Sequence, residues 1–213
     1  MEKPAFGAST SGPIVASISR MLNGILTPNF SRKIPGSALQ SLRQHGITPT
    51  RFILTVSVAK QQMLLFELTR TSFARPQYEF RRSFLVSTSS YGTGQVMNSN
   101  QTPLGLHRIA RKVGAGQPVG TVFRSREAVG LTWQGKADAT IVHRILWLEG
   151  LAPGFNRGGK VDTFQRYIYI HGFGDEMTLG RPKSHGCIHM AAEDLMPLFD
   201  RLPVGTLVWI AER

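Results

Sequence analysis

The stretch FQRYIYIH at residues 164–171 has the clearest strand pattern in the chain, and SHGCIHM follows it at residues 184–190. Aromatic and β-branched residues dominate the first stretch, as is typical of strands. Because side chains alternate across a strand, one face would carry Phe164, Arg166, Ile168 and Ile170, and the other Gln165, Tyr167, Tyr169 and His171. The pattern predicts that His171 ends a strand and faces the same way as Tyr169.

Strand patterns also lie on both sides of this stretch. Residues 52–67 predict a hairpin with its turn at 59–62. Further strands are predicted at 78–87, 106–110, 141–148 and 206–210, and short helices at 14–26, 36–45 and 191–201. We therefore expect a mainly β fold, a sandwich or barrel with a few short helices. Residues 1–50 are predicted to be a partly disordered or helical extension, and residues 51–213 to be one domain.

The composition limits the possible partners. The 213 residues include 25 Lys and Arg against 13 Asp and Glu, a net charge of +12. Such a surface attracts polyanions, including anionic cell-wall polymers. The basic residues form no long block and no RNA-binding motif, so nucleic acid is not an expected partner. No apolar run approaches the roughly 20 residues that span a bilayer, so no transmembrane segment is expected.

Reactive side chains are concentrated near the second stretch. His171, His185, His189 and the only cysteine, Cys187, fall within residues 171–189. A cysteine nucleophile needs an imidazole base and backbone N–H donors for the oxyanion, and a glycine beside it lets substrate approach. The sequence predicts Cys187 as nucleophile and His171 as base, with N–H groups of Gly186 and Cys187 as oxyanion donors. A helix beginning after Cys187 would favour the thiolate.

These motifs resemble the signature of the YkuD-type L,D-transpeptidase catalytic domain. The matching residues are YIHG at 169–172 and SHGCI at 184–188, and the TPLG turn at 102–105 and the hairpin at 52–67 are similar too. The resemblance covers about residues 50–212 and implies the L,D-transpeptidase fold. It implies that Cys187 attacks the substrate carbonyl while His171 transfers the proton. It also implies that the Gly172 carbonyl orients His171, that His185 supports the site and that Ser184 holds the loop.

The function implied by the resemblance is the formation of 3→3 cross-links in peptidoglycan. The partners would be a tetrapeptide stem as donor and an amine of a second stem as acceptor, with no cofactor and no metal. Further expected substrate-binding or oxyanion residues are Ser184, Gly186, Tyr169, His189 and Arg166. The family usually carries Arg or Asn at the position of His189, which bears on how a substrate carboxylate is bound.

Several alternatives remain open at the level of sequence. An L,D-carboxypeptidase would use the same site with water as acceptor, and a non-catalytic cell-wall binder would rely on the positive charge alone. If residues 184–190 are extended, His185, Cys187 and His189 share one face and with His171 could bind zinc. The resemblance implies the bacterial cell envelope or periplasm. No secretory signal is evident, so a cytoplasmic location is also possible. The glycine-rich residues 112–136 are a hypothetical lid.

Overall fold

The fold is taken from a computed structural model that describes residues 33–71, 75–136 and 139–213. The helix expected at 14–26 lies outside the described residues. The two other expected helices are present as α2 (Gly36–Gln44) and α3 (Ala192–Arg201). The strands are β1 (Phe52–Ser57), β2 (Gln62–Arg70), β3 (Gln77–Ser87), β4 (Gly105–Val113), β5 (Thr121–Arg124), β6 (Glu127–Leu131), β7 (Val142–Gly150), β8 (Tyr169–Gly172), β9 (Ile188–Met190) and β10 (Leu207–Ala211). Single 3₁₀ turns lie at Gly159–Val161 and Glu176–Thr178.

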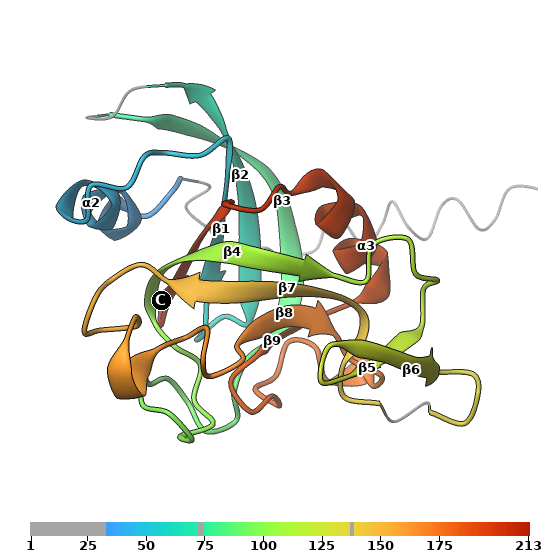
Figure 1. Cartoon of the computed structure of the whole chain (residues 1–213). Helices are drawn as coiled ribbons and strands as arrows, with labels where there is room; N and C mark the ends of the chain where they lie inside the picture. Colours follow the sequence, from blue (N-terminus) through green and yellow to red (C-terminus); the bar gives the residue numbers. More distant parts are fainter. Residues whose placement is uncertain (1–32, 72–74, 137–138) are drawn as a thin grey trace, which may run out of the picture. The chain divides into compact units, whose positions relative to one another are not determined.

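The strands form a sheet that closes on itself. Their order is β4-β10-β1-β2-β3-β9-β8-β7-β5-β6, and β4 also pairs with β7. Eight strands of the described chain therefore form a ring, and the β5–β6 hairpin extends from β7 beyond it (Figure 1). Closure leaves few unpaired strand edges. The predicted mainly β fold is confirmed, in its barrel form.

The strand β1 is almost continuously apolar in sequence because both of its faces are buried. Its residues Phe52 and Leu54 belong to the main core cluster, which includes Phe199 of α3. Between them, Ile53 belongs to a second cluster, which includes Leu42 of α2. Successive side chains point to opposite faces, so β1 is buried on both faces and both require apolar residues. Figure 1 shows α2 and α3 on different sides of the sheet.

Two expectations about local structure are wrong. The strand expected at 164–171 begins only at Tyr169, and residues 164–167 form turns. Asp162 stabilises these turns by accepting the Gln165 N–H on its side chain at 2.9 Å and the Arg166 N–H on its carbonyl at 3.0 Å. Tyr167 has a φ of 57°, which no strand residue adopts. The face expected to join residues 165 and 167 to Tyr169 therefore does not exist.

The second error concerns the segment after Cys187. The strand β9 follows it directly, and α3 begins only at Ala192. A helix dipole acts within about one turn of the helix end. The predicted favouring of the thiolate by this helix is therefore wrong.

Membrane-spanning helices can be assessed for the described ranges. None of the helices there has both the length and the apolar content that a bilayer crossing requires.

Candidate active site

The pairing of β8 with β9 brings the predicted cysteine and histidine together. These strands are parallel, with Ile170 opposite Ile188 and His171 opposite His189. Continuing this register places Cys187 beside Tyr169. Because alternate residues share a face, Cys187 and His171 are diagonal neighbours on one face of the pair. The intervening isoleucines point into the main core on the other face.

The thiol of Cys187 is half-buried and held by backbone groups. Its sulfur accepts a hydrogen bond from the Tyr169 N–H at 3.4 Å, and the S–H donates to the Tyr167 carbonyl at 3.5 Å. Burial raises the pKa of Cys187 to about 11, against the opposing effects of the Tyr169 N–H and of the Arg166 charge. At neutral pH the resting thiol is therefore protonated.

The imidazole of His171 is buried and has a fixed tautomer. Its Nδ1 lies 2.8 Å from the Gly172 carbonyl, which can only accept, so Nδ1 carries the proton and Nε2 is left basic. Burial lowers the pKa of His171 to about 4, although this hydrogen bond raises it. A side chain at Gly172 would collide with the His143 ring and approach the Val142 carbonyl to 2.8 Å. Glycine at 172 therefore permits the close packing of β7 on β8.

The loop that carries Cys187 is tied down by two hydroxyl groups. Ser184 Oγ accepts the Gly186 N–H at 3.2 Å and donates to the Cys187 carbonyl at 2.5 Å. Thr102 Oγ1 donates to the Gly186 carbonyl at 3.2 Å. Gly186 has a φ of 116°, and a Cβ there would lie 3.1 Å from Ile168 Cδ1. The Gly186 N–H, expected to face the oxyanion, is thus engaged within the loop.

Arg166 holds a second loop rather than offering a free charge. Its guanidinium donates to the carbonyls of Gly94 and Gln95 at 3.0 Å and of Gln101 at 2.5 Å. It also donates to Ser99 Oγ at 3.3 Å. These bonds fix the loop at 94–101. The positive charge of Arg166 partly opposes the rise in the pKa of Cys187 that burial causes. Arg166 also lines the pocket described next, so its direct binding of substrate stays a prediction.

A pocket of about 370 Å³ is lined in part by Tyr167, whose carbonyl accepts the hydrogen bond from the Cys187 thiol. Its lining is rich in amide side chains and includes Asn98, Asn100, Gln165, Tyr167 and His185. His185 is exposed, and its ring lies 5.5 Å from that of Tyr91. Asn98 and Asn100 belong to no motif of the sequence and were not predicted to lie at the site. The left-handed φ values of both, 63° and 58°, are features of the folded loop and not of a motif.

His189 lies behind His171 instead of facing solvent. It is 6% exposed, stacks on Phe173 at 4.4 Å between ring centroids, and meets the His171 ring edge-on at 4.9 Å. Burial lowers its pKa to about 3, with further lowering by His171 and His185. Direct contact with a substrate carboxylate is therefore not supported. Over the described ranges, no group of three or more His, Cys, Asp or Glu side chains is arranged to hold a metal ion, so the zinc alternative has no site there.

An aromatic wall with an arginine flanks Cys187 on the side of the β5–β6 hairpin. Trp147, Tyr169 and Phe123 form a buried cluster against which Cys187 packs. Arg126, at the hairpin tip, lies 5.0 Å over the Trp147 ring and donates to the Tyr169 hydroxyl at 3.4 Å. Tyr169 was expected at the site, whereas Arg126 was missed because no motif precedes it. The glycine-rich region expected as a lid thus contains a hairpin.

The fold and the site together define a class: a closed β domain with a cysteine and a histidine on one face of two adjoining strands. Comparison with protein families identifies it further. The family described as the L,D-transpeptidase catalytic domain, YkuD, matches residues 51–210. The chain belongs to this family. Comparison with curated proteins finds no match.

Several solved structures are similar to the chain. The structure of Bdellovibrio bacteriovorus Bd1075 has 13% identity and a TM-score of 0.50 over 78% of this chain and 51% of its own. An L,D-transpeptidase from Mycobacterium smegmatis has 13% identity and a TM-score of 0.44 over 76% of this chain and 58% of its own. L,D-transpeptidase 3 from Mycobacterium tuberculosis, in complex with a faropenem-derived adduct, has 15% identity and a TM-score of 0.43, covering 76% and 60%. The chain thus spans between half and three fifths of these proteins.

Proposed function

We propose that the chain is a peptidoglycan L,D-transpeptidase that forms 3→3 cross-links through a thioester on Cys187. The observation that carries this proposal is the diagonal placement of His171, on β8, and Cys187, directly before β9, in a YkuD-family domain. The basic Nε2 of His171 and the protonated thiol of Cys187 are the two partners that proton transfer requires.

In the acylation step, Cys187 Sγ attacks the carbonyl carbon of the third stem residue. The S–H proton moves to His171 Nε2, and the negative charge passes to the carbonyl oxygen. We assign the N–H groups of His185 and Cys187 to this oxyanion, since the Gly186 N–H is already bonded to Ser184. The peptide C–N bond then breaks, and the imidazolium returns the proton to the departing amine of D-alanine.

In the second step, the amine of another stem attacks the thioester carbonyl. His171 Nε2 takes a proton from this amine and passes it to the departing sulfur, which restores the thiol. A new amide joins the two stems, so each bond that is broken is balanced by one that is formed. Water in place of the amine would give the L,D-carboxypeptidase reaction.

The surroundings of Cys187 support a peptide substrate. The amide side chains of Asn98, Asn100 and Gln165 provide both donors and acceptors, as peptide groups require. On the other side, Arg126 supplies a positive charge suited to the carboxylates of a stem peptide. We infer that the reacting stems lie across Cys187 between these two walls, and that the positive surface holds anionic cell-wall polymers nearby.

The test is mass spectrometry of tetrapeptide-bearing muropeptides after incubation with the protein. We expect cross-linked dimers and released D-alanine, and complete loss of both in Cys187→Ala with an unchanged unfolding temperature. Tripeptides without dimers would assign the carboxypeptidase reaction instead. Equal turnover by Cys187→Ala would contradict the thiol mechanism, and no turnover by either protein would favour a non-catalytic wall binder.

A further inference from the structure

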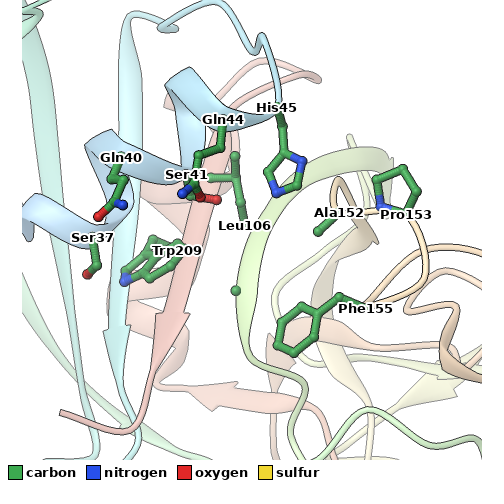
Figure 2. A pocket seen from close by; sticks show the side chains of 11 residues that line it. Ser37, Gln40, Ser41, Gln44, His45, Leu106, Ala152, Pro153, Phe155 and Trp209 are labelled. Atoms are coloured by element: carbon green, nitrogen blue, oxygen red, sulfur yellow. The ribbon is translucent and has the colours of Figure 1, made fainter.

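A second pocket lies outside the site described so far, between α2 and the β4–β10 pair. Its volume is about 350 Å³, within the range of small-molecule sites. Figure 2 shows Trp209 and Phe155 below α2, on either side of the start of β4. The side chains of Gln40 and Gln44 come from the helix above them, and His45 directly follows this helix.

The lining of this pocket is uncharged, although the chain carries a net charge of +12. It contains no Lys, Arg, Asp or Glu, and its polar groups are serine hydroxyls, glutamine amides and one imidazole. Such groups donate and accept hydrogen bonds in equal measure. They suit a neutral ligand with many hydroxyl or amide groups, and not a carboxylate or phosphate.

Aromatic rings flank the base of the pocket. Gly105 has a φ of 97°, and a Cβ there would lie 2.9 Å from the ring of Phe155, which is 47% exposed. The indole of Trp209 lies on the adjoining strand, where Trp209 pairs with Leu106. Its N–H is buried and lacks a hydrogen-bond partner among the described residues. Ring faces beside a glycine offer dispersion contacts to a flat ligand.

An extended peptide is a poor fit for the same pocket. The strand β10 is paired with β1 on one side and β4 on the other, and β4 is paired with both β10 and β7. Neither strand has a free edge to which a peptide strand could add. Recognition here must therefore come from side chains, which favours a compact ring over a peptide backbone.

We propose that this pocket binds an N-acetylated hexosamine of a glycan strand. The proposal rests on the proposed function, because it takes the glycan to be the one that bears the stem peptide. The pyranose ring would lie between Trp209 and Phe155, with its hydroxyl and acetamido groups bonded to Gln40, Gln44 and Ser41. The site would thus hold the sugar while the stem reaches Cys187.

The connection between the two sites is short. Gly105 lies only three positions after Thr102, whose hydroxyl donates to the carbonyl of Gly186 beside the nucleophile. Three residues span at most about 11 Å of extended chain. Asn156 braces the same segment by donating to the Leu104 carbonyl at 3.1 Å and the Leu106 carbonyl at 3.0 Å. A sugar over Gly105 is therefore anchored to the same rigid segment that supports the catalytic loop.

The experiment is a titration of the full chain with chitotetraose, the tetramer of N-acetylglucosamine, followed by the indole N–H signals in ¹H–¹⁵N NMR. The chain has three tryptophans, so each site has its own signal. We expect the Trp209 signal to shift and to saturate at a sugar concentration of about 1 mM, while the signals of Trp133 and Trp147 stay in place. A shift of Trp147 alone would place the sugar in the catalytic cleft and overturn the proposal, as would no shift at all.

Matched variants on α2 complete the test. Gln40 and Gln44 are exposed and line the pocket, whereas Arg43 is exposed and does not. Gln40→Ala with Gln44→Ala should weaken binding about tenfold by loss of hydrogen bonds, and Arg43→Ala should leave it unchanged. A sugar-free stem tripeptide that shifts Trp209 equally would also overturn the proposal. The titration repeated on Cys187→Ala keeps this outcome separate from that of the proposed reaction, since binding needs no turnover.

Discussion

At the scale of single residues, Arg166 holds the loop whose Asn98 and Asn100 line the pocket near Cys187. Its guanidinium bonds to three carbonyls and one hydroxyl of residues 94–101. We predict that Arg166→Lys loses about 2 kcal/mol of unfolding free energy and raises KM, because an ammonium lacks the planar fork that reaches several acceptors. Thermal unfolding and steady-state kinetics measure the two effects. Arg157→Lys, at an exposed position, is the control and should change neither.

The protonation of Cys187 and His171 predicts the pH dependence of the reaction. Burial raises the pKa of Cys187 to about 11 and lowers that of His171 to about 4. The thiol–imidazole pair is therefore neutral between these values, and kcat/KM should fall only as pH drops toward 4 or rises toward 11. Alkylation by iodoacetamide in the absence of substrate should be slow at pH 7 and accelerate toward pH 11. A stepwise increase in the alkylation rate between pH 6 and 8 would instead show that a thiolate–imidazolium pair forms before substrate binds.

The motif residues were the part of the site that sequence could predict. Cys187 and His171 stand in a short pattern whose residue types match the chemistry, so their partnership could be expected before any fold was known. Arg126 lies far from this pattern along the chain. Its role depends on a contact with Tyr169 that only the folded chain creates.

At the scale of elements, the β5–β6 hairpin forms one wall of the site through Arg126. This side chain stacks over the rings of Trp147 and Tyr167 and bonds to Tyr169. We predict that Arg126→Ala raises KM for muropeptides several-fold with little change in unfolding temperature, because the cation–π contacts and the long hydrogen bond of this partly exposed side chain contribute little to stability. Arg124→Ala, exposed on the same hairpin, is the matched control. Equal KM values for both variants would show that the hairpin does not contact substrate.

The elements also show where pattern reading fails. Residues 164–168 have the composition of a strand, yet Phe164 stacks on Trp147 at 4.1 Å and Asp162 holds the turn that follows. Aromatic residues fit a cluster as well as a pleated sheet, so composition alone did not distinguish them. The four residues of β8 that do form a strand are those that position His171.

At the scale of the whole described domain, closure of the barrel was not predictable from local patterns. The pairing of β4 with β7 joins segments that are far apart in sequence, and the parallel pairing of β8 with β9 spans a loop. Strand patterns predict that strands exist, whereas their partners depend on the burial of all faces together. This long-range pairing is also what buries several histidines.

Buried histidines make the stability of the domain sensitive to acid. Burial lowers the pKa of four of them: His107, His143, His171 and His189. The unfolded chain takes up protons on these groups near pH 6.5, whereas the folded chain takes them up only at lower pH. The contribution of these histidines to the unfolding free energy should therefore be fully present above about pH 6.5 and should decrease as pH falls toward 4. For a histidine whose pKa is lowered to about 4, the decrease is up to about 3 kcal/mol.

His189 offers a direct test of this linkage. Its pKa is lowered to about 3, it stacks on Phe173, and its Nδ1 has no partner within the described ranges. Phenylalanine at this position keeps the stacked ring but cannot bind a proton. Urea unfolding of His189→Phe at pH 7 and pH 4.5 should therefore show a smaller loss of stability than the parent chain. His45→Phe, at an exposed position, should leave the loss unchanged. If His189→Phe lost as much stability between the two pH values as the parent, uptake of a proton at His189 would not be part of acid unfolding.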